Sequence, residues 1–497
     1  MSGVAAVISM IHERGRTSSA DRLFRGEPVL AWTLRRLARC GSIDNVAVLC
    51  WEEQLDAVRP IAAAHAAHVL AKGPTATLLQ VEAVAAARRW SEGWRGGLLS
   101  ASAFDRGFVG PWVVEAAARL EADAVALVDP AAGLVDPRLI DALVERSRSS
   151  PELEIAFVPA APGLAGALVR RELLERLARA GGHPGQLLHY HPDLCAAEVL
   201  GGAGCVMPPT PVARSTRSWL LDSDRQVRRI ELATHSLNGE LLDSESEGLV
   251  VRAERVRVAD ESPRDVMVEL GVERHSRPVW WCGRWLSVSR NFVGIEPLAR
   301  MFDDLARFDD TRLTLGGVGD PLACGAAFDV LEAAVAAGID AIHVETDLLG
   351  MDAASIRRLA ELTDVVSVHI PAITARTYRA MMDVDRLDEA LANVQALAEA
   401  RAGEGSRLRL IAPTFVKCVG NLAEMEAWYD SWLRVCGAAV IRGPSDCAGQ
   451  IASAETADMT PPRRVACRRL VRGLVVLCDG TVVACDQDVL GASPLGN

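Results

Sequence analysis

Short apolar runs alternate with amphipathic helical patterns along almost the whole chain, and this alternation constrains the fold more than any other feature. In the first half, helical patterns such as 29–39 separate four runs that look buried. The runs are Val4–Met10, Val46–Cys50, Ala124–Val128 and Ile155–Pro159. Strands that alternate with helices form parallel sheets with helices packed on both faces. We therefore predict an α/β fold, with a doubly wound sheet in residues 1–250.

The alternation restarts near residue 265. The expected strands are Asp265–Val272, Arg312–Gly316, Ala341–Thr346, Val365–Ile370, Leu408–Pro413 and Ala438–Arg442. The expected helices are Glu296–Arg307, Phe328–Ala337, Ala353–Leu362, Leu387–Ala400 and Leu422–Val435. Six such units suit an open barrel, in which ligands bind at the carboxyl ends of the strands. The prediction for residues 251–445 is a partial (β/α)6 barrel.

The remaining residues, 446–497, contain two apolar runs on either side of Asp479-Gly480. This residue pair favours a type I′ turn, so a β-hairpin is expected over 472–487. The length of 497 residues fits about three domains.

Composition limits the classes of function. No apolar run reaches the ~18 residues of a membrane span, and the N-terminal segment favours a first strand over a signal peptide. We therefore expect a cytoplasmic protein without membrane contact. The net charge of −12 argues against binding nucleic acid. Lys72 and Lys417 are the two lysines, so a reaction that needs lysine near phosphate has two candidates.

The segment 273–291 follows the first strand of the second series. It contains one cysteine, Cys282, among tryptophans and arginines. These residues are Trp280, Trp281, Trp285, Arg274, Arg277, Arg284 and Arg290. Two interpretations stay open: the indoles fill space as core, or the segment binds an anionic ligand with its arginines stacked on indole.

The N-terminal segment contains the Gly/Arg/Ser-rich stretch Arg14–Ser19 and then Gly26-Glu27-Pro28-Val29-Leu30. This order resembles the nucleotidyltransferase fold of sugar-nucleotide transferases and cytidylyltransferases. The resemblance implies that a nucleoside triphosphate is held at Arg14, Gly15, Arg16 and Thr17, through backbone donors and arginine. The lysine that follows in that family falls near Asp21 or Arg22 here; an arginine keeps the positive charge, whereas an aspartate would repel the triphosphate.

The same resemblance implies two magnesium ligands. Asp129 follows the apolar run Ala124–Val128, and Asp222 lies in a late Arg-rich segment. Two carboxylates together with phosphate oxygens suit a hard, octahedral cation. The alternative for Asp129 is that it caps the helix after the strand.

Four segments of the second series follow one another in a specific order: Leu315–Leu322 (LGGVGDPL), His343–Asp347, Asp364–Ile370 and Thr374–Tyr378. Their order resembles the core of the radical S-adenosylmethionine (radical SAM) enzymes. The resemblance implies a SAM-like pocket at Gly316, Gly317, Gly319, Asp320 and Pro321, with Asp320 in place of a glutamate.

In that family, three cysteines in the loop after the first strand hold a four-iron cluster. Cleavage of SAM needs three thiolates, whereas Cys282 is alone in its loop. Ser287 and Ser289 are poor substitutes, because neutral hydroxyls are hard ligands. Cys324 is a further single thiol near the strand ends.

The spacing of Cys467, Gly480 and Cys485 resembles the opening of the SPASM/twitch module, which binds an auxiliary iron–sulfur cluster. The resemblance implies Cys467, Cys485 and Cys478 as ligands, with Cys447 as a further candidate. Members of that group continue to more cysteines, whereas the sequence here stops at Asn497. The alternative is a structural remnant without iron.

Three functions follow. The first is a radical SAM/SPASM-like pseudoenzyme that has lost SAM cleavage and acts as a binding protein or as a partner of an active radical SAM enzyme. The second is a magnesium-dependent nucleotidyltransferase in residues 1–250, joining a nucleoside triphosphate to a sugar phosphate or sugar acid. The third is a radical SAM enzyme with a non-standard iron–sulfur site.

Overall fold

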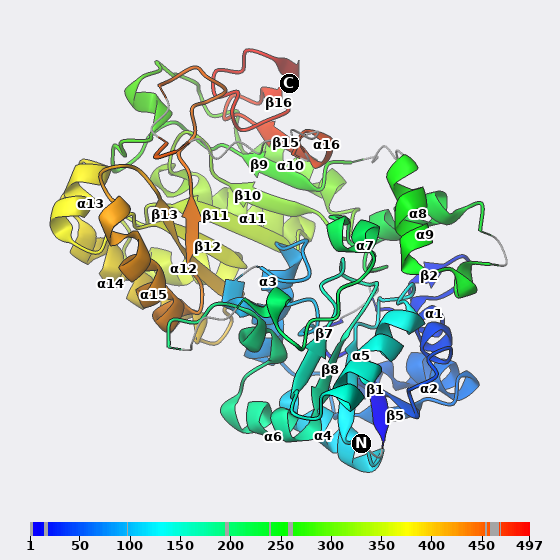
Figure 1. Ribbon diagram of the computed structural model, residues 1–497. Helices are drawn as coiled ribbons and strands as arrows, with labels where there is room; N and C mark the ends of the chain where they lie inside the picture. The colour runs from blue at the N-terminus through cyan, green and yellow to red at the C-terminus, as the bar shows by residue number, and fades with distance from the viewer. Residues whose placement is uncertain are drawn as a thin grey trace. The chain divides into compact units, whose positions relative to one another are not determined.

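The computed structural model describes residues 3–13, 18–96, 98–193, 198–237, 240–256, 262–452, 455–457, 467 and 469–497. The chain forms two compact units, Met1–Ala259 and Asp260–Asn497 (Figure 1). Both are mixed α/β structures whose sheets contain parallel strands, which confirms the α/β class. The finer domain bounds at 250/251 and 445/446 stay predictions.

Unit 1 contains a six-stranded sheet with the order β5-β4-β1-β6-β8-β7. Its strands are β1 (Val4–Ser9), β4 (Asn45–Cys50), β5 (His68–Ala71), β6 (Ala124–Val128), β7 (Ile155–Phe157) and β8 (Ala167–Arg170), and the short pair β2 (Leu23–Phe24) and β3 (Glu27–Pro28) lies apart. The helices described are α1 (Val29–Leu37), α2 (Leu55–Ala64), α3 (Leu79–Arg89), α4 (Gly110–Arg119), α5 (Pro137–Ser149), α6 (Arg171–Ala180), α7 (Thr210–Arg214), α8 (Asp224–Thr234) and α9 (Ser246–Arg255).

Alternate residues of the central strands enter two separate cores. Ala6 and Ile8 of β1 pack with Leu30 and Leu34 of α1, whereas Val7 packs with residues of α4 and α6. Both faces of the sheet are therefore covered, as in a doubly wound fold.

The sheet of unit 1 is not wholly parallel, which corrects the prediction. The strands β5, β4, β1 and β6 are parallel, but β8 pairs antiparallel with both β6 and β7. The connection 158–166 is too short for the dozen or so residues that a parallel crossover needs. The chain therefore turns back directly and lays β8 between β6 and β7.

Unit 2 contains a nine-stranded sheet with the order β14-β13-β12-β11-β10-β9-β15-β16-β17. Its strands are β9 (Asp265–Val268), β10 (Arg312–Leu315), β11 (Ala341–Thr346), β12 (Val365–His369), β13 (Leu410–Val416), β14 (Val440–Arg442), β15 (Gly473–Val476), β16 (Val482–Val483) and β17 (Pro494–Gly496). The helices described are α10 (Ile295–Leu305), α11 (Ala327–Ala337), α12 (Ala353–Leu362), α13 (Ala375–Met382), α14 (Leu387–Arg401), α15 (Met425–Cys436) and α16 (Arg469–Arg472).

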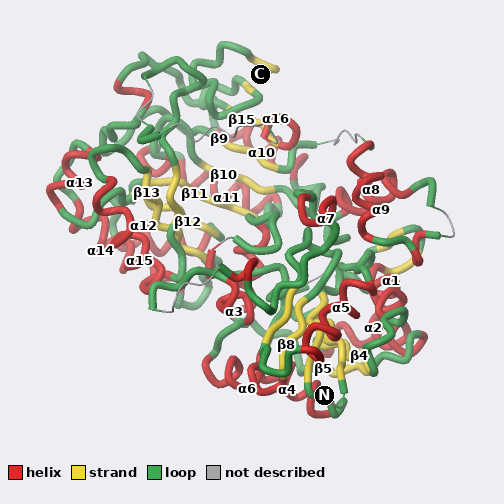
Figure 2. Tube along the Cα trace, in the orientation of Figure 1, coloured by secondary structure: helices red, strands yellow, loops and turns green. Residues whose placement is uncertain are grey.

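Strands β9 to β14 are parallel and lie side by side in chain order, the order of a partial barrel (Figure 2). Helix α10 packs on α11, α11 on α12 and α12 on α14, so these helices form one layer. Curvature and closure of a barrel stay predictions.

The two faces of this sheet differ in polarity. Val266, Leu313, Ile342 and Val366 belong to the core that packs against the helices. Side chains alternate between the faces of a strand, so His343 and Glu345 of β11 share the opposite face. The polar face is where a site can form.

The C-terminal hairpin forms, but its turn differs from the expected type. Strands β15 and β16 are antiparallel, and β15 also joins β9 in parallel. Gly480 has a φ of +91°, whereas Asp479 is not among the residues with positive φ. A type I′ turn needs positive φ at both central residues, so that prediction was wrong. Asp479 instead accepts a hydrogen bond from the backbone N–H of Thr481 at 3.0 Å.

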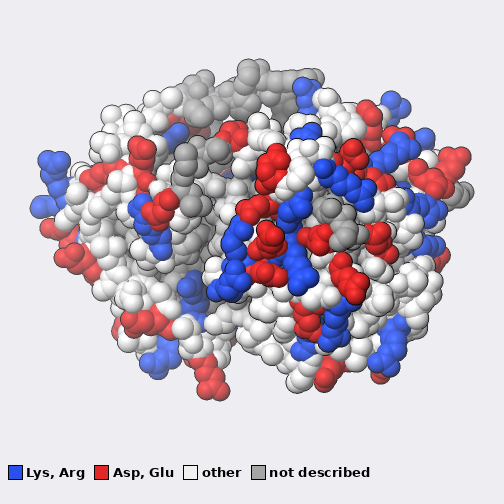
Figure 3. All heavy atoms as spheres, turned by 60° about the horizontal axis from the view of Figure 1, so that its bottom comes forward, with Lys and Arg blue, Asp and Glu red and all other residues white. Residues whose placement is uncertain are grey.

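The described part of the chain has no helix with the length and apolarity that spanning a bilayer requires. On the face shown in Figure 3, described basic and acidic side chains are interspersed.

Candidate functional site

A cavity of about 410 Å³ lies at the carboxyl ends of the unit 2 strands. Its polar lining includes Arg274, Glu345, His369 and Arg442, and the thiols of Cys282 and Cys447 also face it. Ligand pockets of proteins typically measure about 300–1,000 Å³. The volume is therefore sufficient for a small molecule.

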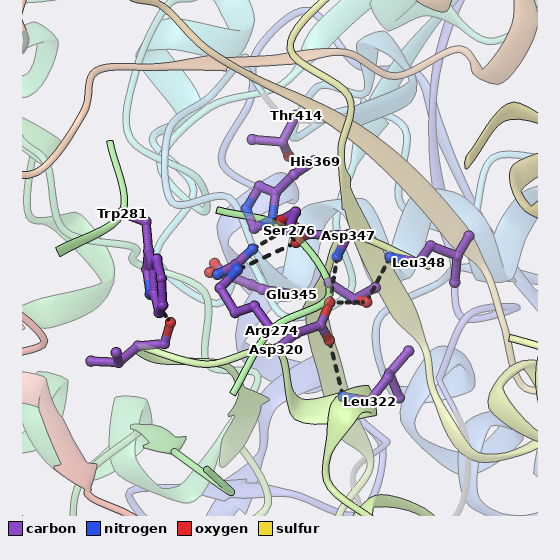
Figure 4. Close-up of polar contacts among 12 residues, drawn as sticks. Arg274, Ser276, Trp281, Asp320, Leu322, Glu345, Asp347, Leu348, His369 and Thr414 are labelled. Atoms are coloured by element: carbon purple, nitrogen blue, oxygen red, sulfur yellow. Dashed lines mark hydrogen bonds and ion pairs between the residues drawn. The ribbon is translucent and has the colours of Figure 1, made fainter. Parts of the chain in front are cut away.

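Asp347, directly after β11, is the centre of a buried polar network beside the cavity (Figure 4). Its carboxylate pairs with the Arg274 guanidinium and accepts hydrogen bonds from Ser276 Oγ and from His369 Nδ1, the latter at 3.1 Å. Burial alone would raise the pKa of Asp347, but the Arg274 charge and the His369 and Ser276 contacts hold that pKa well below its ordinary value.

His369, the last residue of β12, has a defined tautomer. Its Nε2 lies 2.8 Å from the Arg442 guanidinium. Arginine is only a donor, so Nε2 accepts and Nδ1 carries the proton that is donated to Asp347. The same guanidinium lies 3.5 Å from Glu345. Despite burial, Arg442 and the nearby histidines lower the pKa of Glu345 to about 2.

The predicted SAM-like segment Gly316–Pro321 is bonded to its own chain. The Asp320 carboxylate accepts hydrogen bonds from Thr346 Oγ1 (2.9 Å) and from the backbone N–H groups of Asp347 (2.7 Å) and Leu322 (3.0 Å) (Figure 4). Asp320 is 2% exposed. Its carboxylate is therefore already occupied by protein donors.

Val318 lies between these glycines, and both its backbone N–H and its carbonyl form hydrogen bonds. Its carbonyl accepts from Trp281 Nε1 at 2.8 Å, and its N–H donates to Glu269 Oε2 at 3.0 Å. Glu269 in turn pairs with Arg290 at 2.7 Å. The middle of the segment 273–291 thereby contacts the glycine-rich segment, and its C-terminal end pairs with Glu269, which follows β9.

The glycines permit this close approach. A Cβ at Gly319 would clash with the carbonyl oxygen of Gly271 and lie 2.8 Å from that of Glu273. Gly317 has a φ of +118°, and its Cβ would lie 2.9 Å from Glu269. Gly316 meets Glu345 only at ordinary contact distance, 3.6 Å. Sequence reasoning expected the glycines to admit a ligand, whereas the tightest contacts here are with the protein itself.

The tryptophans of 273–291 do not all fit the same interpretation, either core filling or binding of an anionic ligand. Trp280 packs beside Met381 and Cys418, and Trp281 packs beside Cys282, as core residues do. Trp285 is 67% exposed. Arg274 and Arg290 pair with carboxylates. Core filling therefore explains two of the three indoles.

The structure describes the three predicted iron–sulfur ligands, but it does not bring their thiols together. Cys467 is exposed, Cys478 is buried after β15 and Cys485 is half-buried. Within the described ranges, no three His, Cys, Asp or Glu side chains are arranged to hold a metal ion. Beside the cavity two thiols meet, Cys282 and Cys447. A SAM-cleaving cluster needs three, so the described residues do not fit either cluster.

In unit 1, the two predicted magnesium ligands lie close together around an arginine. Arg106 Nη1 is 2.8 Å from Asp222 Oδ2, and Arg106 Nε is 3.3 Å from Asp129 Oδ2. Asp129 Oδ1 also accepts from the N–H of Ala131 at 2.9 Å. Helix α5 has Asp136 as its N-cap, so Asp129 closes a turn and does not cap that helix. A divalent cation fits between the carboxylates only if Arg106 turns away.

His12 and Glu13, in the segment after β1, belong to the same cluster and were missed by sequence reasoning. Burial raises the pKa of Glu13 to about 7, although Ser19 donates to it through N–H (2.9 Å) and Oγ (2.5 Å). Burial of the ring nitrogens and the Arg106 charge hold the pKa of His12 well below its ordinary value.

The place of this cluster in the sheet is the feature from which a site could have been predicted. The chain passes from β1 to β4 on one side and places β6 on the other. Ligands of doubly wound sheets bind where the strand order reverses in this way. The predicted triphosphate residues Arg14, Gly15, Arg16 and Thr17 lie outside the described residues.

No family model matches the chain. An uncharacterized protein of Treponema pallidum (strain Nichols) is 23% identical over 194 residues, 37% of this chain and 54% of that protein. The chain thus spans about half the length of that curated relative.

Solved structures similar to this chain include a cytidylyltransferase and radical SAM enzymes. A cytidylyltransferase from Leptospira borgpetersenii is 16% identical, with a TM-score of 0.36, over 51% of this chain and 93% of that one. Streptococcus suis SuiB bound to S-adenosylmethionine is 11% identical, with a TM-score of 0.40, over 51% and 70%. The anSMEcpe structure with bound AdoMet is 12% identical, with a TM-score of 0.37, over 47% and 77%. Similarity at this level assigns neither ligand nor activity to the chain.

Proposed function

We propose that unit 2 is a binding domain of radical SAM type that does not cleave SAM, and that the protein acts as a binding or partner protein. The observation that carries this proposal is the mutual engagement of Gly316–Pro321 and 273–291. Trp281 Nε1 donates to the Val318 carbonyl, and the Asp320 N–H donates to the Glu273 carbonyl. The Asp320 carboxylate that a SAM-like ligand would use already accepts from Thr346 and Asp347.

The remaining cavity supports binding of a small polar molecule with both charges. Glu345 and Arg442 present opposite charges to it, and His369 presents its Nε2 side next to Arg442. Charged groups held in a concave, partly apolar site give orientation and specificity to a ligand. An active radical SAM enzyme is the protein partner that we propose.

The test is anaerobic reconstitution of the full chain with iron and sulfide, followed by SAM and a strong reductant. We expect less than one four-iron cluster per chain and no 5′-deoxyadenosine, because the two thiols at the cavity are fewer than the three that the cluster needs. Stoichiometric iron together with 5′-deoxyadenosine would establish the non-standard radical enzyme instead. A C282S/C447S variant is the control, because product that persists in it would come from a contaminant.

A second function, magnesium-dependent nucleotidyl transfer in unit 1, is favoured by one specific observation. Asp129 and Asp222 are far apart in the chain, yet both reach Arg106 at the strand-order reversal. Magnesium held by two carboxylates would neutralise charge on a triphosphate during in-line attack. Arg106 would have to leave the position between them.

This second function is tested by thermal unfolding with each common nucleoside triphosphate, with and without magnesium. A working site predicts a nucleotide-dependent rise in Tm that needs magnesium and is lost in D222N, because ligand binding stabilises the folded state. The absence of a shift with every triphosphate would reject it.

A further inference from the structure

Two thiols from distant parts of the sequence meet at the cavity of unit 2. Cys282 lies in the segment after β9, and Cys447 follows β14. Both side chains are buried, 7% and 3% exposed, and pack in one small cluster with Val318 and Val489. The two side chains therefore lie next to each other in this cluster. Both also line the cavity, so a small reagent that enters it can reach them.

The backbone around Cys447 holds its sulfur in place. The N–H of Cys447 donates to Ser445 Oγ at 3.0 Å, and that oxygen also contacts the Cys447 sulfur at 3.7 Å. Ser445 Oγ donates to Gln487 at 2.6 Å. Cys447 has a φ of +52°, a conformation that an ordinary residue rarely adopts. Several contacts therefore fix this thiol opposite Cys282.

The contact makes the two thiols chemically unequal. The neighbouring Cys282 thiol lowers the pKa of Cys447, although burial opposes this, and the Cys447 thiol together with burial raises the pKa of Cys282. The thiolate is the form of cysteine that attacks. Ser445 Oγ contacts the Cys447 sulfur at 3.7 Å, so we take Cys447 as the attacking thiol of the pair and Cys282 as the second thiol within reach.

We propose that Cys282 and Cys447 form a reversible disulfide, a modification site at the cavity that is independent of what the cavity binds. The oxidant is a small disulfide such as oxidised glutathione. The Cys447 thiolate attacks one of its sulfurs, forms a mixed disulfide and releases one thiolate. Cys282 then loses its proton, attacks the Cys447 sulfur and expels the second thiolate.

The atoms and electrons of this exchange balance. The two protein thiols give up two protons and two electrons, and the small disulfide leaves as two thiols. The new bond links the segment after β9 to the segment after β14, across the lining of the cavity. The oxidised chain should therefore unfold at a higher temperature and admit ligands to the cavity more slowly.

The experiment equilibrates the full chain in glutathione buffers of increasing oxidation, blocks free thiols by alkylation and maps the peptides by mass spectrometry. We expect one linked peptide pair, Cys282 with Cys447, which disappears on reduction. In C282S, Cys447 should stop at the mixed disulfide with glutathione, because the second thiol is missing. The matched control C436S, which removes a half-buried cysteine outside the pair, should keep the linked pair.

Full alkylation of both Cys282 and Cys447 in the oxidised wild-type chain, under conditions that glutathionylate exposed Cys467, would overturn the proposal. Peptide mapping of the wild-type chain is sufficient to show this, so the test stands even where C282S fails to fold. Neither outcome depends on SAM or on iron.

Discussion

Replacing Arg106 with methionine should give unit 1 a Mn²⁺ site that the wild-type chain lacks. The guanidinium lies between Asp129 and Asp222, and its removal leaves two adjacent carboxylates facing the space that it filled. Mn²⁺ accepts the oxygen ligands that Mg²⁺ accepts. Electron paramagnetic resonance of free Mn²⁺ measures the binding, and we expect about one ion per chain in R106M.

The same substitution should lower the free energy of unfolding by about 3–5 kcal/mol without metal, because it breaks a buried ion pair and leaves charges uncompensated. Added Mn²⁺ should recover part of that loss. The matched control is R119M, since Arg119 is 61% exposed and its pair with Glu115 is a surface pair, for which the cost is about 0–1 kcal/mol.

The opposite result is equally informative. Stoichiometric Mn²⁺ binding to the wild-type chain that disappears in D222N would show that Arg106 moves aside. It would strengthen magnesium-dependent nucleotidyl transfer in unit 1.

Local patterns in the sequence predicted the elements well and the pairing of strands less well. The strands Ala124–Val128 and Ala341–Thr346 and the helix Ala353–Leu362 have the predicted bounds. The strand Ala167–Arg170 was missed, and with it the antiparallel edge of the unit 1 sheet. Periodicity reports which residues are buried, but not the direction in which a strand meets its neighbour.

The candidate site of unit 1 was predictable in part, since Asp129 and Asp222 were both expected and both lie beside Arg106. Asp129 was expected at a site because the resemblance to nucleotidyltransferases implies a carboxylate after the mid-domain strand, and Asp129 follows β6. Arg106 comes from a loop without periodicity, and nothing in its local sequence places it beside Asp222. The meeting of Cys282 with Cys447 likewise depends on how β9 and β14 are placed within one sheet. No spacing along the chain encodes it.

Replacing Asp347 with asparagine should cost about 3–5 kcal/mol of the free energy of unfolding at pH 7, because the buried Arg274 guanidinium then loses the carboxylate with which it forms an ion pair. The native pKa of Asp347 is depressed. Its stabilising contribution is therefore fully present above the unfolded pKa, about 3.9, and is lost as the pH falls from there toward the native pKa. Urea unfolding at pH 7, 5 and 3 should show the gap between wild type and D347N shrinking only at the acid end.

The matched control is D383N, the same change at a carboxylate that is 52% exposed and 3.4 Å from Arg284. It should cost less than about 1 kcal/mol and show no comparable dependence on pH. Equal costs for D347N and D383N would contradict a charge-paired network behind the cavity. In D347N, His369 Nδ1 would also lose the charged carboxylate that accepts its hydrogen bond. A ¹⁵N chemical-shift change at His369 in D347N, absent from D383N, would therefore assign the cost to this network and not to general loosening of unit 2.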